Sequence, residues 1–94
     1  MIEKVRSDIS AIDAQIIELI AKRADLASRA LRAKRADGLV KINDQQQNER
    51  VLSRAVDMAT ELNIDAGSVK RIFEILIAMN LDIQHELSGE GNLP

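Results

Sequence analysis

The first third of the chain carries an apolar pattern with the period of one long helix. Aliphatic side chains recur at alternating spacings of three and four residues, at Ile2, Val5, Ile9, Ile12, Ile16 and Leu19. This spacing is typical of a helix that packs lengthwise on other helices. The next position of this apolar seam is Arg23. A cation inside an apolar face is costly unless an anion meets it, so Arg23 is the first candidate for a binding role. The alternatives are a buried salt bridge or an arginine that snorkels to the rim.

The length of this helix, from Ile2 to about Arg35, constrains the fold further. About 35 residues make a rod of ~50 Å, whereas a compact chain of 94 residues has a radius of gyration of only ~12 Å. The remaining residues are too few to cover both ends of such a rod. We therefore expect a second copy of the chain to cover it.

Two shorter helices are predicted after the turn at Asp37-Gly38. The second runs from about 45 to 62, because Asp44 can cap it and Gln47 follows three residues later, as in a capping box. The third runs from about 66 to 87, with Asp65 as its N-cap.

The predicted domain is therefore all-α and spans residues 1–87, with one long and two shorter helices in an intertwined homodimer. Residues 88–94 contain two glycines and a terminal proline, and we expect them to form a flexible tail.

Composition and charge exclude several classes of site. The chain has no cysteine and a single histidine, which excludes disulfides and thiolate metal sites; we expect no metal and no cofactor. The net charge is −2 and Phe73 is the only aromatic residue, so nucleic acid is not an expected partner. No apolar run reaches the ~20 residues of a membrane span, and we expect a cytoplasmic protein. Six basic residues against one acid between Lys22 and Arg35 suit a small anion; the alternative is a solvated basic face.

Other polar residues also lie where packing alone would place aliphatic ones. Lys34 is eleven residues after Arg23, about 20° round the helix and ~16 Å along it, and the gap between the two cations suits a small di-acid. Asn80 and Gln84 form an amide pair one turn apart on the apolar face of the third helix. The alternative for Lys34 is an ordinary surface lysine. The alternative for Asn80 and Gln84 is an amide pair that fixes the register of packed helices. Arg6 lies ~26 Å from Arg23 along the same rod, so only an antiparallel partner helix would bring it to the same pocket.

The sequence shows no Ser/His/Asp set, no Cys/His pair, no glycine-rich phosphate loop and no inward pair of carboxylates. An enzyme of this kind would have to hold a flexible anion in a reactive shape. It would also place positive charge and hydrogen-bond donors where negative charge develops.

From about residue 2 to residue 86, the chain resembles the all-helical chorismate mutases. The resemblance rests on the order and spacing of four segments: Val5 to Asp13, Ile20 to Ala27 with Ala33-Lys34 after it, Ile42 to Asp44, and Arg71 to Ile77 continuing to Asn80 and Gln84.

This resemblance implies an intertwined dimer that rearranges chorismate to prephenate in the biosynthesis of phenylalanine and tyrosine. Arg23 would bind a substrate carboxylate, and Lys34 would meet a carboxylate and the ether oxygen. Gln84 would hydrogen-bond that oxygen as the bond breaks. Arg6 would come from the partner chain. Asp44 would lie by the ring hydroxyl.

The resemblance implies three further substrate-binding residues in the expected pocket. Asn80 stands where the family often has serine. Gln47 and Asn48 stand where the family usually has Arg and Glu, so one charge of each sign is absent and the Asn48 amide would replace a carboxylate at the ring hydroxyl. An isochorismate pyruvate-lyase and a non-catalytic helical module are the alternative functions. The joint presence of Arg6, Arg23, Lys34 and Gln84 favours a working mutase pocket.

Overall fold

The computed structural model of the chain describes residues 1–36 and 45–88, without side-chain detail for Arg35 and residues 81–88. Three helices account for nearly all of these residues, and the described part contains no strand: α1 (Ile2–Ala36), α2 (Gln45–Glu61) and α3 (Ala66–Ser88). The prediction of an all-α chain with one long and two shorter helices is confirmed, and each bound agrees with the predicted one within a residue.

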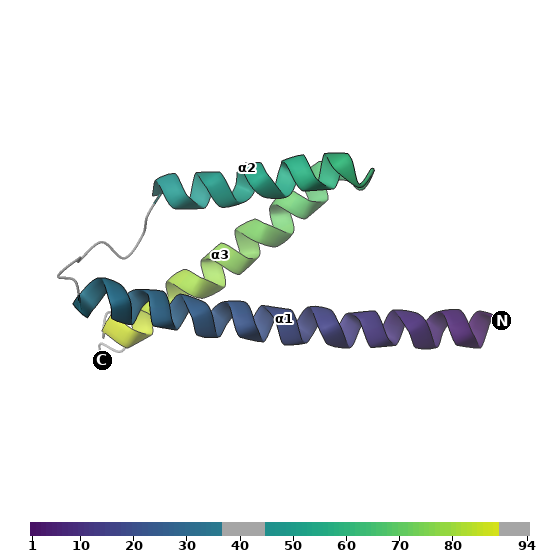
Figure 1. Ribbon diagram of the computed structural model, residues 1–94, viewed down its shortest axis with the longest axis horizontal. Coiled ribbons are helices and arrows are strands. Elements are labelled where there is room, and N and C mark those ends of the chain that lie inside the picture. The colour runs from purple at the N-terminus through teal and green to yellow at the C-terminus, as the bar shows by residue number, and fades with distance from the viewer. Residues whose placement is uncertain (37–44, 89–94) are drawn as a thin grey trace.

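The helix α3 holds the described helices together, because it packs against both α1 and α2 while those two do not contact each other. Figure 1 shows α2 and α1 running across the view with α3 as the diagonal between them. Among the described residues, the buried apolar side chains are Leu31 of α1 and Ala55 and Ala59 of α2. The two alanines let α3 approach α2 closely, so the gap between α1 and α2 is set by the thickness of α3.

The junction between α2 and α3 is built by two local capping motifs. At the end of α2, the Ile64 N–H donates to the Ala59 carbonyl at 3.0 Å and the Asn63 N–H donates to the Thr60 carbonyl at 3.2 Å. This is a Schellman motif, and Asn63 fills its left-handed position with φ of 60°. At the start of α3, the Asp65 carboxylate accepts hydrogen bonds from the Ser68 N–H at 2.8 Å and the Ser68 hydroxyl at 2.6 Å. Asp65 is therefore the N-cap, as predicted.

The N-terminal half of α1 extends beyond the other two helices (Figure 1). Its six seam residues, Ile2 to Leu19, are each between 47% and 61% exposed in the single chain. The radius of gyration is 16.5 Å and the longest extent 54 Å, against ~12 Å expected for a compact chain of this length. None of the described helices is long and apolar enough to cross a membrane.

Candidate active site

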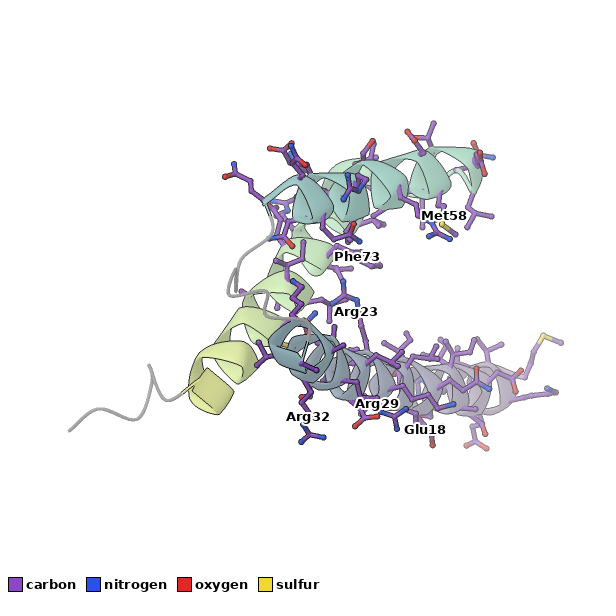
Figure 2. All side chains as sticks on the ribbon, turned by 60° about the vertical axis from the view of Figure 1, so that its left-hand side comes forward. Glu18, Arg23, Arg29, Arg32, Met58 and Phe73 are labelled. Atoms are coloured by element: carbon purple, nitrogen blue, oxygen red, sulfur yellow. The ribbon has the colours of Figure 1, made fainter. Side chains whose placement is uncertain are left out.

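Arg23 lies at the centre of the contacts between the three helices. Its side chain is half-buried, and its guanidinium carbon lies 5.9 Å from the centre of the Phe73 ring, which gives a cation–π contact. The Nη1 atom is buried and has no hydrogen-bond partner among the described residues. Figure 2 shows Arg23 on the side of α1 that faces α2, whereas Arg29 and Arg32 lie on the opposite side.

A cavity of about 310 Å³ lies between the three helices. Its lining comes from α1, α2 and α3 and consists of Arg23, Val51, Arg54, Ala55, Met58 and Phe73. Figure 2 shows Met58 on the side of α2 that faces Arg23 and Phe73. The volume is at the lower end of the ~300–1,000 Å³ typical of ligand pockets, so the cavity suits a small molecule.

A second cavity of about 240 Å³ lies between α1 and α3 and is almost entirely apolar. Its lining consists of Ile16, Leu19, Ile20, Arg23, Ile72, Phe73 and Leu76. Arg23 and Phe73 line both cavities, so the guanidinium lies where the apolar cavity meets the larger one. Partial removal of this cation from water strengthens its attraction for an anion.

The larger cavity has a positive lining. Its described residues include two arginines, Arg23 and Arg54, and no acidic side chain. Ion pairs do form elsewhere on α1, at 3.0 Å between Lys4 and Asp8 and at 3.0 Å between Arg29 and Asp25, both on exposed surface. Among the residues that the structure describes, the lining includes no Ser, Cys, Lys, His or carboxylate side chain. The arrangement can therefore bind an anion and stabilise developing negative charge.

None of the other predicted residues whose side chains the structure describes lines this cavity in the single chain. Lys34 is half-buried near the C-terminal end of α1, and Asn80 is half-buried on α3. On α2, Asn48 is half-buried, while Gln47 is exposed and accepts a hydrogen bond from Arg50 Nε at 3.1 Å. Their roles stay predictions.

Of three further predicted residues, one lies far from the cavity around Arg23 and two have side chains that the structure does not describe. Arg6 is exposed on the N-terminal half of α1, 17 residues before Arg23 and so ~26 Å away on the same helix. Asp44 lies outside the described residues. Gln84 lies within α3, but its side chain is outside the description.

Arg54 was not predicted from the sequence as a site residue, although a signal was present. It follows Gln47 by seven residues and Val51 by three, so it shares one face of α2 with both. Arg54 lines the cavity because α3 holds that face of α2 opposite Arg23. A sequence pattern within α2 alone does not reveal this arrangement. Within the described residues, no group of three or more His, Cys, Asp or Glu side chains is placed to hold a metal ion.

Comparison with known proteins gives two matches. The family model described as chorismate mutase type II matches residues 5–85. A curated protein from Methanocaldococcus jannaschii, named chorismate mutase, is 35% identical over 93 residues, and the alignment covers 96% of this chain and 93% of that protein. No solved structure matches the chain.

Proposed function

Since the chain belongs to the chorismate mutase type II family, we propose that it catalyses the rearrangement of chorismate to prephenate. This reaction serves the biosynthesis of phenylalanine and tyrosine, and we assign it to the cytoplasm. The observation that carries the proposal is that the family match, residues 5–85, contains every residue that lines the cavity around Arg23. The family match supports the activity, and the two arginines in the cavity lining supply positive charge for an anionic substrate.

The cavity chemistry fits this substrate because chorismate is a small di-acid with an apolar ring. In the rearrangement, an ether C–O bond breaks while a C–C bond forms within the same molecule, so no group is transferred to the protein. The protein must hold the side chain of chorismate over its ring and stabilise negative charge at the ether oxygen. Neither task needs a nucleophile or a cofactor.

In our proposal, Arg23, which lines the cavity, binds a substrate carboxylate with the part of its guanidinium that faces the cavity. Its Nη1 is buried and lacks a hydrogen-bond partner among the described residues, and an unpaired buried donor of this kind costs about 1–3 kcal/mol. Lys34, half-buried farther along α1, contacts a carboxylate and the ether oxygen. Gln84 hydrogen-bonds the same oxygen as the bond breaks.

We further propose that the working unit is a homodimer with Arg6 supplied across the interface. The exposed seam of α1 supports this proposal, since a second copy would cover it. Within one chain, Arg6 and Arg23 are ~26 Å apart along the helix. An antiparallel partner helix would place the Arg6 of one chain near the Arg23 of the other. Arg6 binds a carboxylate in this proposal, Asp44 and Asn48 lie by the ring hydroxyl, and Gln47 and Asn80 are assigned to substrate binding as well.

The deciding experiment is an assay of chorismate consumption with identification of the product, run beside isochorismate. Prephenate formed from chorismate is the expected result. Pyruvate released from isochorismate, with chorismate left unchanged, would establish the lyase activity instead. If neither substrate is consumed by folded protein, the enzymatic function is wrong.

The assigned roles of Arg23 and Lys34 predict a large loss of activity on truncation. Arg23→Ala and Lys34→Ala should each lower kcat/KM about 100- to 1,000-fold, which is the usual effect of removing one donor from developing charge. Arg29→Ala is the matched control, because Arg29 pairs with Asp25 on the exposed face of α1, and it should keep the wild-type rate. A Lys34→Ala enzyme at wild-type rate would refute the assigned mechanism.

A further inference from the structure

We propose that Arg54 of α2 is a substrate-binding residue that grips one of the two carboxylates of the di-acid, opposite Arg23. This inference rests on the proposed function. The inference adds to the expected pocket a cation that was not predicted from the sequence. It is based on which residues line the cavity and on which helices they lie.

The first argument is the position of Arg54 on its helix. Val51, Arg54, Ala55 and Met58 follow one another at intervals of three, one and three residues and all line the same cavity. They form one face of α2, and buried Ala55 holds this face toward the protein interior. Arg54 is thus an exposed cation beside apolar side chains that line the same cavity, whereas Arg23 in the seam of α1 is half-buried.

The second argument is electrostatic. Arg23 and Arg54 line the same cavity of about 310 Å³, and no acidic residue lines it within the part of the chain that the structure describes. Neither arginine forms an ion pair with any of the described residues, whereas Arg29 and Lys4 both do. Two like charges that face one small cavity repel each other, and an anionic group that enters the cavity relieves this repulsion. A molecule with two carboxylates matches this pair of cations in number and sign.

The third argument is the separation of the two helices. The helices α1 and α2 do not contact each other, because α3 spaces them apart, so Arg23 and Arg54 approach the cavity from opposite walls. Cations on opposite walls can hold the two carboxylates of one molecule at the same time and so fix its orientation. Arg54 would therefore act mainly in binding and positioning, with a larger effect on KM than on kcat.

The test compares Arg54→Ala, Arg54→Met and Arg54→Lys with wild type in the full-length protein. Arg54→Met retains an unbranched apolar stem and a good helix former, so it reports loss of charge should the alanine variant fold poorly. In the two neutral variants, kcat/KM should fall about 10- to 100-fold, mostly through KM, as expected for the loss of a charged hydrogen bond. Arg54→Lys should recover part of this loss. Arg32→Ala is the control, because Arg32 lies on the opposite side of α1 (Figure 2).

A second readout separates carboxylate binding from a structural role. Inhibition by cis-cyclohexane-1,3-dicarboxylate and by cyclohexanecarboxylate is measured, and the binding of both acids is measured directly by titration calorimetry. The neutral variants should bind the dicarboxylate about 10- to 100-fold more weakly and leave the weak inhibition by the monocarboxylate unchanged, since Arg23 still holds that group. A fold defect would weaken both inhibitors together.

Two results would overturn the inference while leaving the function intact. One is an Arg54→Met enzyme with wild-type KM that still discriminates between the two acids. The other is an Arg54 variant that no longer forms the wild-type oligomer but binds the dicarboxylate with unchanged affinity per folded protomer. That result would show that Arg54 is an interface residue. If wild type itself leaves chorismate unconsumed, the proposed function fails, and the dicarboxylate binding measurements still decide the role of Arg54.

Discussion

The position of Arg23 shows a conflict between stability and function within one residue. The seam of α1 is aliphatic before it and resumes with Leu26, so packing alone would select an aliphatic side chain at this position. The guanidinium gains a cation–π contact with Phe73, worth about 0.5–1 kcal/mol. It loses more through the buried Nη1 without a hydrogen-bond partner in the described chain, which costs about 1–3 kcal/mol. Without ligand, Arg23 is therefore a net destabilising residue.

This balance predicts that Arg23→Leu makes the protein more stable and inactive. Leucine removes the unpaired donor and completes the apolar seam, so the free energy of unfolding should rise by about 1 kcal/mol while prephenate formation is lost. Urea unfolding at a fixed protomer concentration measures the change. Arg32→Leu, at an exposed position, should stay within about 0.5 kcal/mol of wild type. A lower urea midpoint for Arg23→Leu would mean that the guanidinium is needed for the fold.

Among the elements, the junction between α2 and α3 depends most on side-chain chemistry. Asn63 ends α2 in a left-handed conformation, and Asp65 begins α3 two residues later. The pKa of the Asp65 carboxyl is lowered from its ordinary value of 3.8, first by the hydrogen bond from the Ser68 hydroxyl and then by the Ser68 backbone N–H. This short junction fixes the direction of α3 and, through it, the distance between Arg23 and Arg54.

The lowered pKa of Asp65 predicts a pH-dependent contribution to stability. Because the unfolded chain binds this proton more tightly than the folded chain does, acid favours unfolding. The contribution is present in full well above 3.8 and is lost as the pH falls through the lowered pKa. Asp65→Ala should therefore lower Tm at neutral pH, and the difference from wild type should shrink below pH 3.8. Asp57→Ala, an exposed site within α2, is the control; a difference that does not change with pH would show that Asp65 makes no charged cap.

At the scale of the whole molecule, the features that could be predicted from the sequence are those set by residues close together along the chain. The three helices, the break between the second and third helices and the Asp65 cap all follow from residues within a few positions of each other. Arg23 was identified because it interrupts a periodic pattern. Arg54 was not, since its role depends on which face of α2 the helix α3 turns toward α1. The parts of the pocket that involve Arg6 depend on a second chain and stay predictions.

The exposed seam of α1 predicts that a single negative charge placed on it will separate the subunits. Ile9 is 52% exposed in the single chain and lies in the seam, so a partner helix would bury it, and Ile9→Asp would place an unpaired carboxylate in that interface. The variant should elute as a monomer in size exclusion with light scattering, with a lower Tm and little activity, because Arg6 no longer reaches a partner's pocket. Ala14→Asp adds the same charge on the opposite face of α1, halfway between seam positions, and should remain a dimer. Wild-type protein that is monomeric at micromolar concentration, with a Tm independent of concentration, would refute the dimer, because the apolar surface of the rod would then be stable in water without a partner.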